Sequence, residues 1–170
     1  VVDETADLEQ AGRDIVRGAS FDNNVICTDE KGVFAVASIV DELKQHMLNH
    51  GAYEIDSGQL ERLLKVLFTD SPPPGRHGTM NKAFIGKNAN VLLKEIGIEV
   101  GDEIRLVIAE VPAEHPLVWS EQMMPIMPIV RMRDAYEAID LAKRSEHGFR
   151  HTAVMHSKNL DHLDRMARVM

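Results

Sequence analysis

IRLVIAEV, residues 104–111, is the clearest strand signal in the chain and decides the class of fold that we expect. Further strand runs lie at 33–37 (VFAVA), 126–132 (IMPIVRM) and 152–156 (TAVMH). Short, largely apolar runs of this kind are typical of strands that are buried on both faces of a sheet.

Helical patterns alternate with these runs. Helices are expected in six segments, at 6–17, 39–49, 59–68, 88–96, 134–145 and 159–170. Ser38 and Ser57 are the expected N-caps of the second and third of these helices. Strands that alternate with helices of these lengths predict an α/β fold, with a largely parallel sheet covered by helices on both faces.

The strongest break in the pattern is Pro72-Pro73-Pro74-Gly75, in a polar loop that runs to about Thr79. Because apolar patterning resumes soon afterwards, we interpret this loop as an excursion within one domain and not as a domain boundary. A length of 170 residues also suits a single domain.

Composition excludes several classes of function. The chain carries 19 Lys and Arg against 27 Asp and Glu, a net charge of −8, which argues against nucleic-acid or anionic-membrane partners. No apolar run approaches the roughly 20 residues of a membrane span, and no signal segment opens the chain. The single cysteine excludes an intrachain disulfide and a cysteine-based zinc site. We therefore expect a cytoplasmic protein.

Both ends of the chain look cut, because it starts at Val1-Val2 without an initiator Met and stops inside a helical pattern at Met170. We expect a fragment of a longer protein. Such a fragment should associate or expose a large apolar patch along the Met-rich segment 123–132. A soft hydrophobic core is the alternative interpretation of the same methionines.

Cys27 is the candidate nucleophile. It lies in SFDNNVICTDEK, residues 20–31, between the first helix and the first strand, and loops beside strand ends are where α/β proteins place reactive groups. A thiolate needs a favourable environment. Lys31 is the only local cation, and three nearby acids oppose a negative charge: Asp22, Asp29 and Glu30. The alternative is a small buried structural cysteine.

We expect no metal site. His46 and His50 have the spacing that places two imidazoles on one helix face, but HMLNH lacks the Glu that HExxH chemistry requires. His147, His151 and His156 have no carboxylate at ligand spacing. Solvated histidines are therefore the favoured interpretation. No glycine-rich phosphate loop follows a predicted strand, so this segment alone carries no nucleotide site.

Two long stretches resemble the aldehyde dehydrogenase superfamily. They are DETADLEQAGRDIVRGASFDNNVICTDEK, residues 3–31, and SEQMMPIMPIVRMRDAYEAIDLAKRSEHGFRHTAVMHSKN, residues 120–159. The chain most resembles the CoA-acylating branch, the acetaldehyde and propionaldehyde dehydrogenases of ethanolamine and propanediol breakdown. FDNNVIC and HGFRHTA are specific to that branch, whereas the EQMMP element is shared more widely. The similarity covers the whole chain.

The resemblance implies a role for four residues. Cys27 matches the catalytic cysteine, whose thiolate adds to an aldehyde, loses hydride to NAD (or NADP) and passes the acyl group to coenzyme A. The Cys27 N–H would hold part of the oxyanion. Glu121 matches the acid that contacts the nicotinamide ribose, although Met123 and Met124 replace the usual Phe and Gly. Arg150 and His151 are assigned by analogy to the acyl or CoA entrance.

The resemblance also implies that residues 1–170 are a catalytic domain that is inactive alone, with the dinucleotide-binding domain and the oligomerisation arm elsewhere. The full enzyme would be a homo-oligomer in the cytoplasm or in a bacterial microcompartment. Two alternatives stay open. One is the aldehyde dehydrogenase half of a bifunctional aldehyde/alcohol dehydrogenase, and the other is a non-catalytic α/β interaction module.

Overall fold

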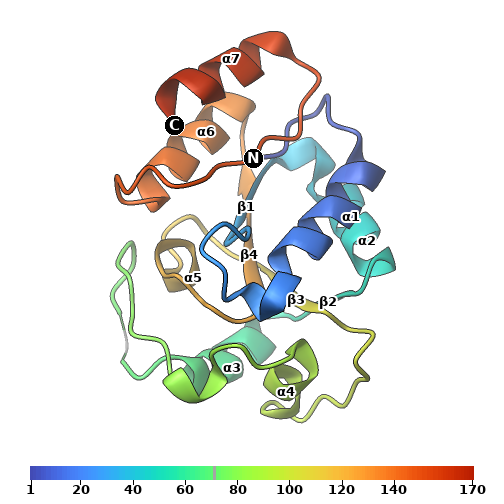
Figure 1. The fold of residues 1–170 in the computed structure, drawn as a ribbon, viewed down its shortest axis with the longest axis vertical. Coiled ribbons are helices and arrows are strands. Elements are labelled where there is room, and N and C mark those ends of the chain that lie inside the picture. The colour runs from blue at the N-terminus through green and yellow to red at the C-terminus, as the bar shows by residue number, and fades with distance from the viewer. Residues whose placement is uncertain (71) are drawn as a thin grey trace.

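A parallel β-sheet forms the centre of the molecule (Figure 1). In the computed structural model, which describes residues 1–70 and 72–170, the sheet has four strands in the order β1-β4-β3-β2, and each neighbouring pair is parallel. The strands are β1 (Val33–Val36), β2 (Ala52–Glu54), β3 (Leu106–Glu110) and β4 (Ile126–Met132). The predicted parallel sheet is therefore confirmed.

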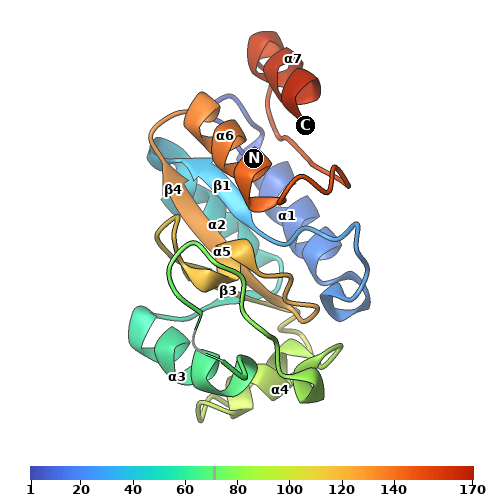
Figure 2. The same cartoon turned by 90° about the vertical axis from the view of Figure 1, so that its left-hand side faces the viewer.

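Helices cover both faces of this sheet, as expected. One face packs against α1 (Leu8–Ala19) and α2 (Val40–Asn49). The other is covered by α3 (Ser57–Leu67), α4 (Ala89–Lys94), α5 (Pro116–Trp119) and α6 (Ala135–Ser145). The last helix, α7 (Leu160–Val169), packs beside α6. Figure 2 shows α5 and α6 on the near side of β4 and α2 on its far side.

Alternate strand residues enter two hydrophobic cores. The core under α1 and α2 takes Val33, Ala35, Leu106, Ile108, Met127 and Ile129. The core on the opposite face takes Phe34, Val107, Ala109, Ile126, Val130 and Met132. Because successive strand side chains point to opposite faces, burial of both faces requires nearly continuous apolar runs. That requirement explains why these strands could be recognised in the sequence.

The predicted serine caps are wrong. Ser38 lies inside a 3₁₀ turn, Ala37–Ile39, and α2 begins at Val40 without any side-chain cap. Asp56, not Ser57, caps α3: its Oδ1 accepts from the Gln59 N–H at 2.7 Å, while Gln59 Oε1 accepts from the Asp56 N–H at 2.8 Å. This reciprocal pair satisfies two backbone donors, more than a serine cap alone would satisfy.

Strand β2 and helix α5 were not predicted. β2 has only three residues at the sheet edge, too few for a periodic pattern to be visible. Gly51 brings the chain into β2 with φ of +95°, and a Cβ there would lie 2.8 Å from the Glu103 carbonyl oxygen. Helix α5 has four residues and starts at Pro116, where the sequence shows no amphipathic repeat.

The strand predicted at 152–156 is wrong. Of residues 152–156, only His156 makes a bridge, a parallel one to Val2, which also bridges Ala35 of β1. Residues 152–154 are exposed and belong to no strand, although the Val154 carbonyl oxygen accepts from the Val1 ammonium at 2.8 Å. A β-former run becomes a strand only where a neighbour pairs along its length, and here only residues 1–3 lie alongside.

Asp3 joins the two ends of the described chain. Its side chain is fully buried and accepts from the Thr5 N–H at 2.8 Å, from Thr5 Oγ1 at 2.7 Å and from Ser157 Oγ. His162 Nδ1, on α7, lies 2.7 Å from its other oxygen, which Ser157 shares. Figure 1 shows the N-terminus close to α6 and α7. This cluster fixes α7 against the start of the chain.

The Met-rich segment does not form the predicted exposed patch. Met124, Met127 and Met132 are 0–5% exposed. Met127 and Met132 belong to β4, which lies between β1 and β3 in the sheet, and Met124 just before it packs into the core on the α3–α6 face. The alternative interpretation of these methionines as soft core is the correct one. The most exposed large apolar side chains lie elsewhere, at Phe21, Tyr136, Phe149 and Leu160.

Among residues 1–70 and 72–170, no helix has the length and hydrophobicity needed to cross a lipid bilayer.

We expect Asp3 to stabilise the fold in a pH-dependent way. Burial raises the pKa of Asp3, but hydrogen bonds from Ser157, Thr5 and His162 outweigh burial and lower that pKa below its usual 3.8. A carboxyl with a lowered folded-state pKa stabilises the protein above its unfolded pKa, and this contribution is lost as pH falls through the folded pKa. Asp3→Asn should therefore cost about 2 kcal/mol of unfolding free energy at pH 7.

Chemical denaturation of wild type and Asp3→Asn between pH 7 and pH 3 measures this effect. The difference between the two proteins should shrink as the pH falls below about 4. Glu61→Gln, which changes an exposed carboxylate on α3, is the control and should change little at any pH. A difference that stays constant across this range would contradict the prediction.

Candidate active site

The segment 20–31, named here the Cys27 loop, connects α1 to β1 through an unusual backbone. Asp22, Asn23 and Asn24 have φ of 43°, 53° and 64°, three consecutive residues in the left-handed region. Asn and Asp tolerate this region better than other non-glycine residues. The sequence Asp-Asn-Asn therefore reverses the chain abruptly after α1 and leaves Cys27 exposed as a free thiol.

Asn24 holds the Cys27 loop together from inside. Its side chain is 1% exposed, and Nδ2 donates to the carbonyl oxygens of Ala19 at 2.7 Å and Glu30 at 3.0 Å. The first carbonyl lies at the end of α1, and the second lies three residues before the start of β1. One buried amide therefore joins the beginning and the end of the loop that carries Cys27.

Lys31 holds the same loop from its other side. Its Nζ donates to the Asn24 carbonyl oxygen at 2.6 Å, to Asn24 Oδ1 at 2.9 Å and to the Ile26 carbonyl oxygen at 3.1 Å. Burial lowers the pKa of Lys31, while negative charge on Glu121, Asp29 and Cys27 acts in the opposite direction. A cation thus lies close to the candidate nucleophile.

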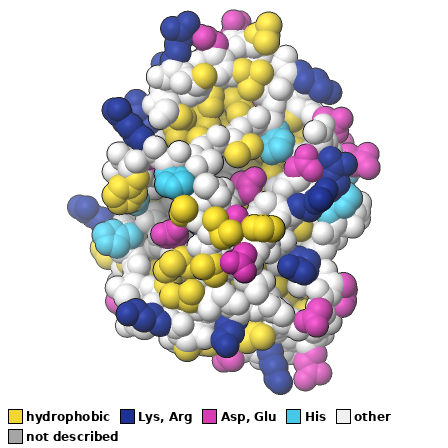
Figure 3. All heavy atoms as spheres, in the orientation of Figure 1, with side chains coloured by type: hydrophobic (Ala, Val, Ile, Leu, Met, Phe, Trp, Pro, Cys, Tyr) yellow, Lys and Arg dark blue, Asp and Glu magenta, His cyan; other side chains and the backbone are white. Residues whose placement is uncertain are grey.

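Two distant segments of the chain pack against the Cys27 loop. Asn23 Nδ2 donates to the Gly86 carbonyl oxygen at 3.0 Å and to Asn88 Oδ1 at 2.7 Å. Gly86 N–H in turn donates to the carbonyl oxygen of Met123 at 3.0 Å, where the backbone is again left-handed with φ of 52°. Figure 3 shows several groups of hydrophobic side chains on one face of the molecule, with acidic and histidine side chains between them.

Glu121 lies beside the Cys27 loop. Its carboxylate is 4.0 Å from Lys31 Nζ, its side chain is 54% exposed, and it accepts no hydrogen bond within the described ranges. The next residue, Gln122, is fully buried and donates to the Leu117 carbonyl oxygen at 2.6 Å, which fixes this segment to α5. The fold therefore brings Glu121 and the Cys27 loop together, and Lys31 is the loop residue that faces Glu121.

Arg150 and His151 lie on a separate exposed turn after α6. The Arg150 N–H donates to Glu146 Oε2 at 2.6 Å, and His151 Nδ1 lies 2.7 Å from Thr152 Oγ1. His147 at the start of this turn contacts the carbonyl oxygen of Trp119 at 3.0 Å, two residues before Glu121. Across the described residues, no hydrogen bond or ion pair joins Arg150 or His151 to Cys27 or Glu121.

The site lies at the amino ends of the strands. The Cys27 loop precedes β1, and Glu121 precedes β4, which is the neighbour of β1 in the sheet. Ligand sites in open parallel sheets usually lie at the opposite, carboxyl ends. Sequence reasoning placed Cys27 beside a strand end but did not find the bracing by Asn24 and Lys31. The run of Asp-Asn-Asn before the cysteine was the available signal.

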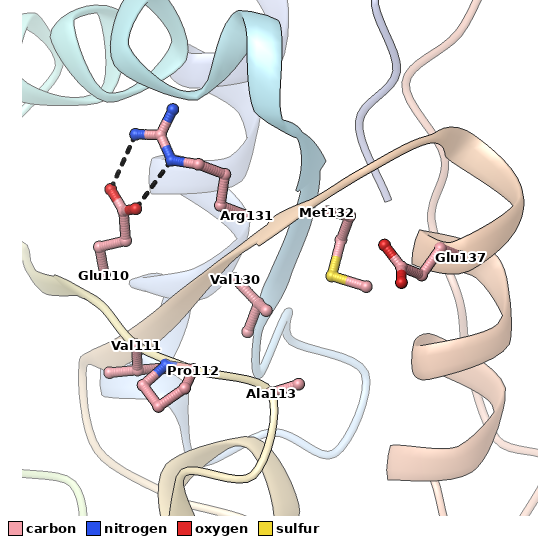
Figure 4. A pocket seen from close by; sticks show the side chains of 8 residues that line it. All are labelled: Glu110, Val111, Pro112, Ala113, Val130, Arg131, Met132 and Glu137. Carbon is pink, nitrogen blue, oxygen red and sulfur yellow. Dashed lines mark hydrogen bonds and ion pairs between the residues drawn. The ribbon is translucent and has the colours of Figure 1, made fainter.

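A cavity of about 460 Å³ lies at the carboxyl ends, away from Cys27 (Figure 4). Arg131 beside it donates to both oxygens of Glu110, at 2.8 and 3.0 Å, and to Asp41 at 2.8 Å. These carboxylates raise the pKa of Arg131 further above its usual range. The guanidinium is saturated by protein carboxylates, so we interpret this cluster as a brace between β3, β4 and α2.

Histidine and carboxylate side chains are dispersed over the part of the chain that the structure describes. No group of three or more potential His, Cys, Asp or Glu ligands is found in residues 1–70 and 72–170. His46 lies 3.8 Å from Glu42 on the same helix, and His50 is exposed.

Comparison with known proteins gives strong matches over the whole chain. No family model matches. The chain is 44% identical over 170 residues to the acetaldehyde dehydrogenase (acetylating) EutE of Salmonella typhimurium, covering 100% of this chain and 36% of that protein. It is 40% identical over 171 residues to the propanal dehydrogenase (CoA-propanoylating) of Citrobacter freundii, with the same coverage. The chain spans about a third of the length of these relatives.

Solved structures of similar proteins agree with this match. Rhodopseudomonas palustris propionaldehyde dehydrogenase, with bound CoA and an acylated cysteine, superposes with a TM-score of 0.91 at 45% identity, over 98% of this chain and 37% of that one. An engineered glycolyl-CoA reductase with bound NADP+ gives a TM-score of 0.92 at 46% identity, over 99% of this chain and 37% of that one.

A more distant sequence relative is the bifunctional aldehyde-alcohol dehydrogenase of Escherichia coli, which is 27% identical over 92% of this chain and 17% of its own length.

We expect Asn24 to be required for the shape of the Cys27 loop. Asn24→Gly keeps the left-handed backbone but removes the side-chain hydrogen bonds, and should cost about 2 kcal/mol of unfolding free energy. Asn24→Ala also strains the backbone at φ of 64° and should cost about 1 kcal/mol more. Equilibrium unfolding measures both, with the exposed Asn49→Ala as control. Equal stability of all three variants would contradict this prediction.

Proposed function

We propose that this chain, which carries the sequence and the fold of the CoA-acylating branch of the aldehyde dehydrogenase superfamily, is the catalytic domain of an enzyme that oxidises a short-chain aldehyde to an acyl-CoA. The observation that carries the proposal is the exposed thiol of Cys27 beside Lys31, in a chain similar throughout to an enzyme with an acylated cysteine. Acetaldehyde and propionaldehyde are the substrates that the relatives' names favour.

The first step is addition of the Cys27 thiolate to the aldehyde carbonyl carbon. A carbon–sulfur bond forms, the carbonyl π electrons move to oxygen, and a thiohemiacetal oxyanion results. The backbone N–H of Cys27 donates no hydrogen bond within the described residues, so it is free to stabilise this oxyanion.

Glu121 suits the binding of a nicotinamide cofactor. Its half-exposed carboxylate has free lone pairs that can accept hydrogen bonds from ribose hydroxyls, and it lies beside the Cys27 loop. Bound NAD or NADP supplies the hydride acceptor for the oxidation. Cys27 then carries the acyl group as a thioester, which keeps it activated toward a second thiol.

Transfer to coenzyme A releases Cys27. The CoA thiolate attacks the thioester carbonyl, a new carbon–sulfur bond forms, and the Cys27 thiolate leaves as the acyl-CoA departs. Arg150 and His151 are assigned to the acyl or CoA entrance, where an exposed guanidinium suits the phosphates of CoA.

The rest of the enzyme follows from the same proposal. Residues 1–170 would form the catalytic domain, and a dinucleotide-binding domain and an oligomerisation arm would lie elsewhere in a homo-oligomer. Cytoplasmic or microcompartment location is supported by a structural match at 41% identity, over 99% of this chain and 37% of that one with a TM-score of 0.91, to a propionaldehyde dehydrogenase of a Clostridium phytofermentans microcompartment.

Two alternatives have less support. Identity to the bifunctional aldehyde-alcohol dehydrogenase is 27%, against 40–44% for the acylating enzymes named above. A non-catalytic module with a buried structural cysteine is disfavoured because Cys27 is exposed.

Cys27→Ala in the full-length protein should abolish acyl-CoA formation from propionaldehyde, NAD and CoA, with a loss of roughly 10³-fold or more, because no other group of this chain forms the thioester. Thiol-ester formation is measured by mass spectrometry of the acyl-CoA product. Thr28→Ala, at the adjacent exposed position, is the control and should retain activity. Undiminished turnover in Cys27→Ala would end the proposal.

Arg150→Ala should raise the KM for CoA several-fold and leave kcat nearly unchanged, as expected where a contact binds ground and transition states equally. Steady-state kinetics with varied CoA at saturating aldehyde measures this effect. Arg62→Ala, an exposed change on α3, is the matched control. An unchanged KM would remove Arg150 from the CoA entrance.

A further inference from the structure

The ammonium group of Lys31 has an unusual set of partners. It donates three hydrogen bonds, and all three acceptors are neutral: two backbone carbonyls and the amide oxygen of Asn24. A neutral amine has only two N–H groups, so three donated bonds require the charged ammonium form. The positive charge is therefore bound in place without being neutralised by a hydrogen-bonded carboxylate.

We propose that Lys31 is the positioning residue of the nucleophile: its ammonium group closes the Cys27 loop and presents a fixed positive charge to the Cys27 thiolate. This inference rests on the function proposed above for Cys27. Lys31 touches neither substrate nor cofactor in this assignment and acts through the cysteine.

The hydrogen bonds show how the loop is closed. The carbonyls of Asn24 and Ile26 lie just before Cys27 in the sequence, and Lys31 lies just after it, at the entry to β1. Lys31 therefore ties the two sides of the turn together around Cys27. Asn24 belongs to the same hydrogen-bond network. Its Oδ1 accepts from Lys31, and its Nδ2 donates to the carbonyl oxygens of Ala19 and Glu30.

Other charged groups lie close enough to Lys31 to interact with its positive charge. Glu121 faces it at 4.0 Å from the segment before β4, and Asp29 faces it from the Cys27 loop itself. Glu30 is adjacent in sequence, but burial raises the pKa of its carboxyl and so disfavours its charged form. Glu121 is thus the main competitor of the thiolate for the Lys31 charge. Removal of Lys31 and removal of Glu121 should have opposite effects on Cys27.

The test is the pH dependence of Cys27 alkylation by iodoacetamide in the full-length enzyme, followed by mass spectrometry of the Cys27 peptide. A nearby cation favours the thiolate, so Lys31→Met should raise the midpoint of the profile by roughly one pH unit. Lys31→Arg keeps the charge and should restore the midpoint. Lys94→Met, which removes an exposed lysine on α4, should leave it unchanged.

The Glu121→Gln variant should shift the midpoint of the alkylation profile in the opposite direction. Without the competing carboxylate the midpoint should fall by about half a pH unit. The substitution should not disturb folding, because the Glu121 side chain is half-exposed. If Lys31→Met does not fold, the proposal is tested with Glu121→Gln and Lys31→Arg. A midpoint in Glu121→Gln equal to that of wild type then overturns the proposal. A folded Lys31→Met protein with a wild-type midpoint also overturns it, even if its kcat is reduced.

Failure of this inference differs from failure of the proposed function. Alkylation reports on the Cys27 thiol without any turnover. Full activity of Cys27→Ala would refute the enzyme mechanism, whereas an unshifted alkylation profile in active enzyme would refute only the role of Lys31.

Discussion

Adjacent parallel strands start at the same edge of a sheet, and here β1 and β4 are neighbours although ninety residues or so separate them in the chain. The segments that precede these strands are therefore forced together. One contains Cys27 and the other contains Glu121. The candidate site depends on this pairing, because it is the pairing of β1 with β4 that places Glu121 beside the Cys27 loop.

The backbone N–H and C=O groups of an irregular segment beside the sheet need hydrogen-bond partners that a helix or a strand would otherwise supply. The Cys27 loop does so with the side chains of Asn24 and Lys31, which together bond four carbonyl oxygens of residues 19–30. This bonding fixes a turn that three left-handed residues begin. It also leaves the cysteine exposed, in contrast to the usual burial of a lone thiol in a hydrophobic core. Structural and chemical roles thus fall on the same polar residues.

The charged side chains at the two ends of the sheet are paired differently. At the carboxyl ends, Arg131 is bonded to Glu110 and Asp41, and Lys44 is bonded to Glu54 and Glu110, so opposite charges neutralise one another. At the amino ends, the hydrogen-bond acceptors of Lys31 are neutral, and its carboxylate neighbour Glu121 lies farther away, at 4.0 Å. A cavity of about 460 Å³ lies at the carboxyl ends and not beside Cys27, so concavity alone does not mark the candidate nucleophile.

The amino-acid sequence by itself determined the parallel sheet and its two helical layers, because continuous apolar runs are a local property of the chain. A family motif, which is also local, singled out Cys27 and Glu121 as candidates. It misjudged residues 152–156, the serine caps and the Met-rich segment, because pairing, capping and burial depend on which neighbours a residue meets. Only the tertiary structure decided that Lys31 of the Cys27 loop lies beside Glu121. That contact joins segments remote in sequence, and no local pattern encodes a distance of 4.0 Å between them.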